Sequence, residues 1–171
     1  MLNPFEKLYK FCPNCKTRLI KKSIFKKTRI VCPNCNFIFW NNPRPSFSAL
    51  IIDKKKNILL LKRADKPLKD YWCLPGGVME YDESPERSII REVKEETNLD
   101  FKIEKLTGVY LIDNDPRGNV VDVIYMSQTI NSPVKLSNEH SQYKFFPPNN
   151  LPELIAYKHR EAIADYLKKD Q

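Results

Sequence analysis

The sequence predicts an α/β domain preceded by a small cysteine-containing module, and three observations support this organisation. Two CxxC pairs lie within the first 40 residues. Segments 47–53 and 58–63 have the near-continuous apolar character of strands that are buried on both faces. Residues 85–97 carry an amphipathic helix pattern. We therefore divide the chain into a module of residues 1–40 and a main domain of residues 41–171, joined by a proline-containing linker.

The N-terminal module is defined by two CPNC segments with sixteen residues between them. This spacing is typical of a site in which four cysteines hold one zinc ion, here Cys12, Cys15, Cys32 and Cys35. The residues between the pairs are predicted to form a basic hairpin, with 37–40 as a third strand. Because about 40 residues bury too little surface to fold alone, zinc would supply the stability. The alternative is a pair of redox or disulfide-forming motifs, which an intracellular setting disfavours.

Charge is unevenly distributed along the chain. Lys and Arg number 29 against 21 Asp and Glu, but residues 1–40 contain nine cations and a single acid, Glu6. The main domain is therefore neutral and the excess lies in the N-terminal module. A basic zinc module with aromatics such as Phe25 and Trp40 could contact nucleic acid. Aromatics of this kind more often pack a miniature core or dock on the adjoining domain, and we favour that interpretation.

The chain contains neither a run of eighteen apolar residues nor the N-terminal pattern of a secretory signal. We therefore expect a cytoplasmic protein that does not enter a membrane.

The helix at 85–97 has clear start and stop signals. Ser84 is a suitable N-cap, and Pro85 fits the first helical position, where no backbone donor is needed. Asn98 favours the left-handed conformation that ends many helices. The helix is thus predicted to begin and end within this stretch.

The side chains of this helix divide into two faces at about 100° per residue. The apolar stripe comprises Ile89, Ile90, Val93 and Thr97. Glu92, Glu95 and Glu96 share a different face, where their mutual repulsion would be offset by a divalent cation. Carboxylates without a neighbouring His or Cys suit Mg²⁺ or Mn²⁺. The alternative interpretation is an acidic helix that is simply solvated.

The segment in front of the helix, 74–77, is predicted to leave a strand in a sharp turn. Gly76 and Gly77 lack a Cβ, so the backbone there can approach a metal ion or a substrate phosphate closely. We expect both glycines to contact the substrate. An ordinary Gly-Gly turn is the alternative.

The stretch 77–99 resembles the Nudix box, G-x5-E-x7-R-E-U-x-E-E-x-G-U, in which U is aliphatic. The positions that match in register are Gly77, Glu83, Arg91, Glu92, Val93, Glu95, Glu96 and Leu99. Asn98 replaces the second Gly of the box and tolerates the same backbone conformation.

The resemblance implies an α/β/α Nudix sandwich with a mixed sheet. It also implies site roles. The metal ligands and catalytic carboxylates would be Glu92, Glu95 and Glu96, with a backbone carbonyl from Gly76 or Gly77. Glu83 and Arg91 would form a structural ion pair.

The segment 108–125, GVYLIDNDPRGNVVDVIY, resembles the corresponding segment of ADP-ribose pyrophosphatases within the Nudix family. Pro116 lies where that substrate class carries a proline beyond the box. The resemblance implies hydrolysis of the pyrophosphate bond of a nucleoside diphosphate derivative, and of ADP-ribose to AMP and ribose 5-phosphate in particular. Arg117 would pair with a phosphate or ribose of this substrate. Taken alone, the Pro and Gly here indicate only a β-turn.

Residues 131–142 are predicted to form a polar loop, and related Nudix enzymes carry a catalytic glutamate on such a loop. The resemblance therefore implies that Glu139 is the general base, although it could equally be one exposed acid. His140 and His159 lack metal-ligand spacing and are expected at the surface. Residues 151–168 are predicted to form a closing helix. The resemblance also suggests a homodimer.

Three other functions remain open. The zinc module suggests an NADH or dinucleotide pyrophosphatase, but the SQPWPFP-like motif of that branch is absent. A house-cleaning nucleoside triphosphatase is the second. The third is a nucleotide-sensing regulator that binds nucleic acid through its zinc module. The intact set of Glu92, Glu95 and Glu96 argues against it, because a sensor need not keep metal ligands.

Overall fold

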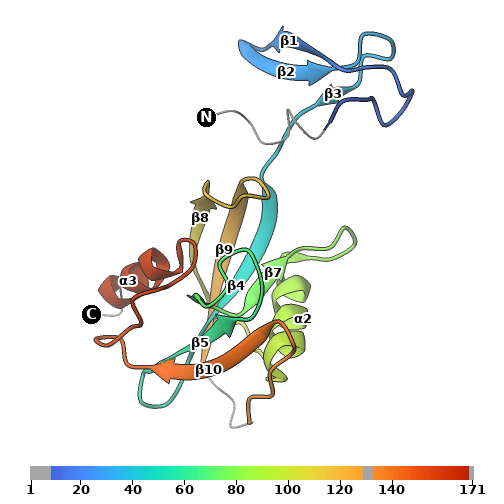
Figure 1. Cartoon of the computed structure of the whole chain (residues 1–171). Coiled ribbons are helices and arrows are strands. Elements are labelled where there is room, and N and C mark those ends of the chain that lie inside the picture. The colour runs from blue at the N-terminus through green and yellow to red at the C-terminus, as the bar shows by residue number, and fades with distance from the viewer. Residues whose placement is uncertain (1–8, 129–132, 170–171) are drawn as a thin grey trace. The chain divides into compact units, whose positions relative to one another are not determined.

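The computed structural model of the chain describes residues 9–128 and 133–169. The chain forms two compact units, Met1–Pro43 with Pro116–Gly118 and Arg44–Asp115 with Asn119–Gln171. We call them the N-terminal unit and the main unit, and Figure 1 shows the elements of each. In the described part of the chain, no helix combines the length and apolar character needed to cross a membrane.

The N-terminal unit contains a three-stranded antiparallel sheet. Its strands are β1 (Ile20–Ile24), β2 (Lys27–Val31) and β3 (Ile38–Phe39), in that order. Ile24 pairs with Lys27, so only Phe25 and Lys26 form the turn of the hairpin. The predicted hairpin and third strand are therefore confirmed.

The main unit is built on a mixed sheet. Its long strands, in spatial order, are β10 (His140–Phe146), β5 (Ile58–Arg63), β4 (Arg44–Ile52), β9 (Val120–Gln128) and β8 (Lys105–Ile112). Two short strands extend the pairing, β6 (Trp72–Cys73) beside β5 and β7 (Gly76–Val78) beside β4. The β4–β9 pair is parallel and the other pairs are antiparallel.

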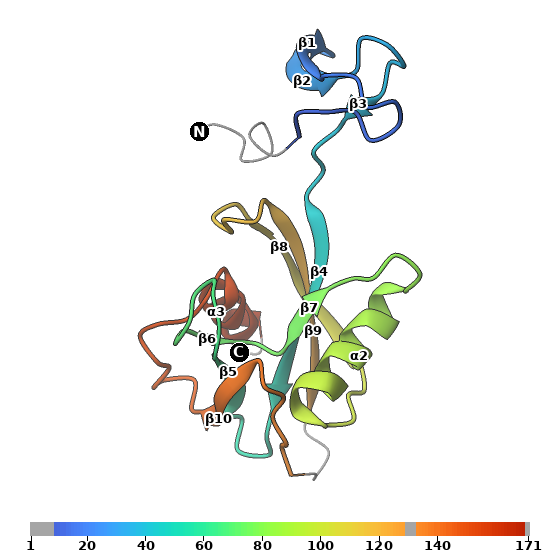
Figure 2. The same ribbon diagram turned by 45° about the vertical axis from the view of Figure 1, so that its right-hand side comes forward.

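Both faces of this sheet are covered. Alternate residues of β4 point to opposite sides, so Phe47, Ala49 and Ile51 join the core under α2 (Pro85–Thr97). Leu50 and Ile52 instead join the core under α3 (His159–Lys169). Figures 1 and 2 show the two helices on opposite sides of the strands. The predicted α/β/α sandwich with a mixed sheet is confirmed.

Three local predictions are wrong. Gly76 and Gly77 lie in strand β7 and pair with β4, where a sharp turn was expected. Ile90 is exposed, because the helix buries only the narrower strip around Ile89 and Val93. The closing helix begins at His159, eight residues later than predicted.

The late start of α3 has a clear cause. The backbone N–H of Trp72 donates to the Leu154 carbonyl at 2.9 Å, and the N–H of Ala156 donates to the Trp72 carbonyl at 2.7 Å. These residues thus extend the sheet beside β6, which a helical backbone could not do.

The strand predicted to begin at residue 101 begins only at Lys105. The expected end of its partner strand, Ile130, lies outside the described residues.

Candidate active site

Helix α2 is fixed at both ends. The Ser84 hydroxyl accepts a hydrogen bond from the Arg87 N–H at 3.3 Å, and Pro85 occupies the first turn. Asn98 has φ 58°, and its N–H donates to the Lys94 carbonyl at 2.9 Å. The predicted caps are thus confirmed, and they set where the box side chains project.

The loop that precedes β10 is hydrogen-bonded to the C-terminal end of α2. The Lys135 N–H donates to the Thr97 carbonyl at 2.9 Å, and the Ser137 N–H donates to the Glu96 carbonyl at 3.2 Å. These bonds satisfy helix carbonyls that have no partner within the helix. The loop is therefore anchored two residues before Glu139.

Glu96 is the most buried carboxylate of the site, at 5% exposure. Its Oε2 accepts a hydrogen bond from the Gly76 N–H at 2.8 Å. Burial raises the pKa of Glu96 to about 8, and the charges of Glu92 and Glu139 add to the rise while the Gly76 N–H opposes it. A carboxylate in this setting is stabilised as an anion by an added cation.

Glu92 lies against the second glycine. A Cβ built on Gly77 would come within 2.5 Å of the Glu92 carboxylate, so glycine is needed for this approach. The Gly77 carbonyl is held by the Ser46 hydroxyl, which donates to it at 3.0 Å. Burial is the main cause of a raised pKa at Glu92 as well.

Arg91 links the acids of the site. It donates to both carboxylate oxygens of Glu83, from Nε at 2.6 Å and from Nη2 at 3.0 Å. This pairing lowers the pKa of Glu83 to about 2. Its Nη1 also lies 2.9 Å from Glu92 Oε1 and 3.1 Å from Glu95 Oε2. Arg91 therefore partly neutralises the two acids nearest to it.

The three box glutamates differ in exposure, and their oxygens are not gathered around one point. The Glu95 side chain is 60% exposed, unlike those of Glu92 and Glu96. In the described ranges, the four cysteines of the N-terminal unit are the only group that brings three or more ligand atoms within 4.8 Å of one another. A metal ion held by all three glutamates would require side-chain rotation, in particular of the exposed Glu95.

The two site residues that were predicted on loops, Glu139 and Arg117, lie in different parts of the structure. The charge of Glu139 contributes to the raised pKa values of Glu92 and Glu96, so it belongs to the same electrostatic site. Its backbone carbonyl accepts from the Ala64 N–H at 2.9 Å. Arg117 is exposed in a turn with Pro116 and groups with the N-terminal unit.

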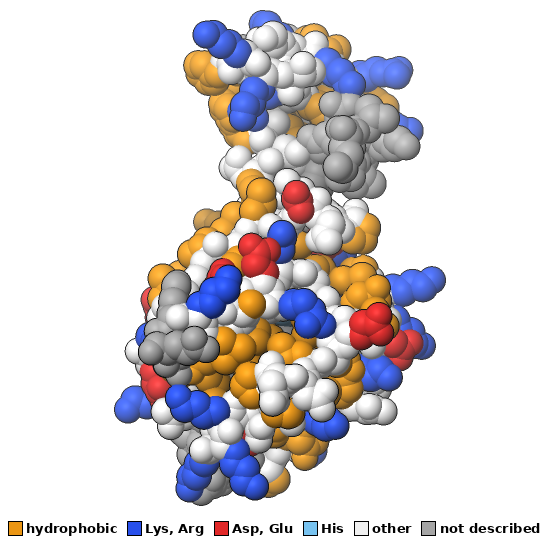
Figure 3. Space-filling view, turned by 90° about the vertical axis from the view of Figure 1, so that its left-hand side faces the viewer, with side chains coloured by type: hydrophobic (Ala, Val, Ile, Leu, Met, Phe, Trp, Pro, Cys, Tyr) orange, Lys and Arg blue, Asp and Glu red, His pale blue; other side chains and the backbone are white. Residues whose placement is uncertain are grey.

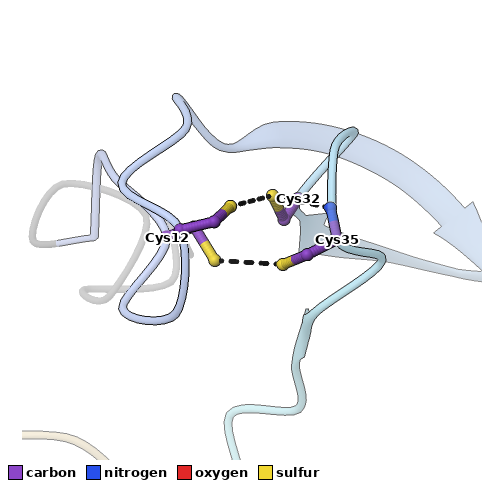
Figure 4. A group of neighbouring side chains, drawn as sticks. Cys12, Cys32 and Cys35 are labelled. Carbon is purple, nitrogen blue, oxygen red and sulfur yellow. Dashed lines mark hydrogen bonds between the residues drawn. The ribbon is translucent and has the colours of Figure 1, made fainter.

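The four cysteines of the N-terminal unit form a second candidate metal centre, shown in Figure 4. The Sγ atoms of Cys12 and Cys35 are 3.5 Å apart, and those of Cys15 and Cys32 are 3.4 Å apart. In each close pair the two cysteines come from different CPNC segments. A redox CxxC site would instead bring together the two cysteines of one segment. Tetrahedral zinc with bonds of about 2.3 Å holds sulfurs about 3.8 Å apart, so the cluster can hold zinc.

The two CPNC segments share one backbone pattern. The N–H groups of Cys12 and Cys32 each donate a hydrogen bond to the carbonyl of the residue five positions later, both at 2.8 Å. The residues that follow the second cysteines, Lys16 and Asn36, both have φ 60°. This repeat aims four sulfurs at one point.

Comparison with known proteins decides the family. The family described as NUDIX domain matches residues 42–166. The chain belongs to the Nudix family. It is 36% identical to the ADP-ribose pyrophosphatase of Methanocaldococcus jannaschii, over 98% of this chain and 89% of that protein. It is 31% identical to a MutT-like protein of Streptomyces ambofaciens, over 71% of this chain and 75% of that one.

A solved structure agrees with this assignment. The crystal structure of a NUDIX hydrolase from Nitrosomonas europaea superposes with a TM-score of 0.79 at 25% identity, covering 94% of this chain and 92% of that one. The protein is therefore a Nudix pyrophosphohydrolase, and its chemistry is the hydrolysis of a pyrophosphate bond.

Sequence reasoning missed one histidine beside the Nudix box. His140 was expected at the surface, but it is buried, with Nε2 3.8 Å from Glu96 Oε1 and 3.6 Å from the Cys73 sulfur. Burial lowers its pKa to about 4, and the charge of Arg63 adds to the effect. His140 is thus a buried, neutral neighbour of Glu96. No signal in its spacing pointed to this place.

The other histidine, also predicted at the surface, is buried in the core of the Nudix fold. His159 Nδ1 accepts from the Leu74 N–H at 3.0 Å, and Nε2 lies 3.4 Å from Asp122 Oδ2. The Ser48 hydroxyl donates to the same carboxylate at 2.9 Å. This network ties α3, β4 and β9 to the segment that leads into Gly76, and it therefore supports the glycine side of the site.

The contacts of the glycines give a first prediction. We expect Gly77→Ala to fold but to lose most of its turnover, because the new methyl group displaces the Glu92 carboxylate rather than backbone. We expect Gly76→Ala instead to lower the melting temperature, since its Cβ would overlap the Phe47 carbonyl and its φ is +145°. Thermal unfolding and kcat of both variants check this. Normal turnover in folded Gly77→Ala would contradict the role of Glu92.

Proposed function

We propose that this protein hydrolyses ADP-ribose to AMP and ribose 5-phosphate with the help of Mg²⁺ or Mn²⁺. The observation that carries the proposal is the 36% identity to an ADP-ribose pyrophosphatase over nearly the whole of both chains. The DPRG segment around Arg117, similar to that of the same enzymes, supports it.

The donor set fits a divalent cation. Glu92 and Glu96 are buried enough for their pKa values to be raised, Glu95 is 60% exposed and paired with Arg91, and the Gly76 and Gly77 carbonyls are nearby oxygen donors. All are hard oxygen ligands of the kind Mg²⁺ and Mn²⁺ take. When bound, such an ion neutralises phosphate charge and lowers the pKa of a coordinated water.

The remaining roles fall to side chains of this protein. Glu139 would accept the proton of the attacking water, because its loop is tied to the end of α2 and its charge reaches Glu92 and Glu96. The water oxygen bonds to one phosphorus of the pyrophosphate, and the bond from that phosphorus to the bridging oxygen breaks. Arg91 and Glu83 would hold the glutamates in place.

A substrate panel tests this proposal. We would measure kcat/KM with Mg²⁺ and with EDTA for ADP-ribose, NADH, ADP-sugars, diadenosine polyphosphates and nucleoside triphosphates. We expect ADP-ribose to rank first, to yield AMP and ribose 5-phosphate, and to require the metal. A tenfold preference for NADH or for a triphosphate with release of pyrophosphate would reject the substrate assignment.

The role proposed for Arg117 has its own test. We expect Arg117→Ala to raise the KM for ADP-ribose about tenfold with little change in kcat, because a charge-assisted hydrogen bond to substrate is lost. Arg117→Lys should recover part of the loss, and the melting temperature should stay unchanged. Equal falls in kcat and in 1/KM, or a lower melting temperature, would contradict a purely binding role.

A further inference from the structure

The N-terminal unit presents an aromatic pair formed by Phe25, in the turn of its hairpin, and Trp40, which follows strand β3. Phe25 is 80% exposed and Trp40 is 43% exposed, and their rings lie 6.3 Å apart with an angle of 16° between their planes. A ring with this exposure does not form part of a miniature core. Of the two arrangements expected for these aromatics, packing in a miniature core is therefore wrong for Phe25, and docking on the adjoining domain stays a prediction.

The backbone at Phe25 is unfavourable for that residue. Phe25 has φ 49° and Lys26 has φ 60°, and together they form the two-residue turn between β1 and β2. Turns with two left-handed residues favour Asn and Gly, and a bulky side chain there is uncommon. Local stability therefore does not account for phenylalanine at this position, whereas presentation of its ring to a partner does.

Positive charge surrounds this pair. Residues 9–43 include eight Lys and Arg and no acid, and four zinc-bound thiolates with one Zn²⁺ would lower their net charge only from +8 to +6. Figure 3 shows several of these side chains in blue on the face of the N-terminal unit that it displays. The Arg29 guanidinium lies 4.6 Å from the centre of the Trp40 ring, and its Nη1 donates to the Trp40 carbonyl at 3.0 Å. Arg29 thus fixes the backbone and the ring of Trp40 together.

A groove of about 360 Å³ runs beside Trp40 within the same unit. Its polar lining includes Lys27, Thr28, Asn41 and Asn42. Hydroxyl and amide groups of this kind both donate and accept hydrogen bonds. A ribose 2′-hydroxyl has the same two capacities, whereas deoxyribose offers nothing at that position.

We propose that the N-terminal unit binds single-stranded RNA. Unpaired bases stack on Phe25 and Trp40, the surrounding lysines neutralise phosphates, and the groove takes up ribose hydroxyls. Solvent-exposed aromatic rings within a basic surface are the features that single-strand binding uses, since every base has a face that can stack. A duplex keeps its bases stacked and cannot use these rings. This binding is separate from the hydrolysis proposed above, because it involves no residue of the Nudix box.

The first test uses the full-length zinc-loaded protein and a fluorescein-labelled 12-nucleotide RNA of mixed, unstructured sequence. Fluorescence anisotropy in a Mg²⁺-free buffer measures the affinity as the salt concentration is raised. With about three or four phosphates neutralised, log K should fall against log salt with a slope of about −2 to −3. No binding at low salt, or binding without salt dependence, would overturn the proposal.

The decisive variant is Phe25→Asn. Asparagine suits the left-handed turn better than phenylalanine, so this change removes the ring while the fold is kept or stabilised. We expect RNA affinity to fall about tenfold, with zinc content and melting temperature maintained and ADP-ribose turnover unchanged. Trp40→Ala should give a similar loss. Tyr81→Asn, which removes a fully exposed ring from the main unit, is the matched control and should bind as the unmodified protein does.

Competing nucleic acids complete the test. Single-stranded DNA of the same sequence should bind at least severalfold more weakly, and the RNA duplex more weakly still. Equal affinity for the DNA strand would overturn the assignment to RNA. Tighter binding of the duplex, or unaltered binding by Phe25→Asn, would overturn the stacking surface itself.

Discussion

Replacing Glu96 with Gln is expected to lower kcat about a thousandfold and to leave the fold intact. Glu96 is the buried acid of the Nudix box, and its Oε2 accepts the Gly76 N–H, a bond that the amide oxygen of Gln can also accept. The variant therefore removes the charge while it keeps the contact. Steady-state hydrolysis of ADP-ribose measures the loss, and Mn²⁺ binding followed by electron paramagnetic resonance gives a readout that does not depend on activity.

The same substitution should stabilise the metal-free protein at high pH. The pKa of Glu96 is raised from 4.5 to about 8 in the folded state, mainly by burial. A raised pKa gives stability that is fully present below pH 4.5 and is lost as the pH rises towards 8. Glutamine has no such loss, so the melting temperature of Glu96→Gln in EDTA should exceed that of the unmodified protein at pH 8.5 and approach it near pH 5.

The matched control is Glu86→Gln, which removes an exposed acid from the first turn of the same helix. It should keep turnover and Mn²⁺ affinity. If Glu96→Gln retained a tenth or more of kcat together with normal Mn²⁺ binding, the assignment of Glu96 as a metal ligand would be wrong. If it gave no stability gain in EDTA at pH 8.5, the raised pKa would be wrong.

Local signals in the sequence were enough to place the helix of the site. Ser84 and Asn98 act through bonds to residues three or four positions away, and Pro85 acts through its own ring and missing N–H, so their effect can be predicted from spacing alone. The side on which the glutamates lie follows from the same periodicity. The width of the buried strip does not, because it depends on how closely the sheet approaches, and Ile90 is exposed for that reason.

Long-range contacts account for what the sequence could not predict. His159 binds the Leu74 N–H across 85 positions, and Ser48 binds Asp122 across 74. A lone histidine carries no sign of such a partner, so both histidines were placed at the surface. Gly76 and Gly77 were singled out for a close approach to a metal ion or phosphate, but the need for glycine that the structure shows arises from Phe47 and Glu92, which meet them only after folding.

Replacing Cys32 with Ser is expected to abolish zinc binding and to unfold the N-terminal unit. Cys32 is fully buried, its sulfur lies 3.4 Å from that of Cys15, and it also accepts the Cys35 N–H at 3.5 Å. Structural zinc contributes about 10–16 kcal/mol to the folding of small modules. The short sheet of this unit, with Ile30 and Val31 as its main buried aliphatic side chains, cannot replace that contribution.

Zinc analysis and limited trypsin digestion measure the two effects together. The unmodified protein should contain one zinc per chain and resist cleavage within residues 10–35, although this stretch holds eight Lys and Arg. Cys32→Ser should lose the zinc and be cut there within minutes. Cys73→Ala, which removes a buried thiol from the main unit, is the matched control and should keep both properties.

The main unit should survive the loss of zinc. Among the residues that the structure describes, its two cores are formed by residues from 47 onward, and none of these members comes from the N-terminal unit. Cys32→Ser should therefore keep the main thermal transition while it loses RNA binding, which requires a folded hairpin to present Phe25 and Trp40. Stoichiometric zinc in Cys32→Ser would show that the four cysteines are not the ligands. Loss of the main transition would show instead that the two units do not fold independently.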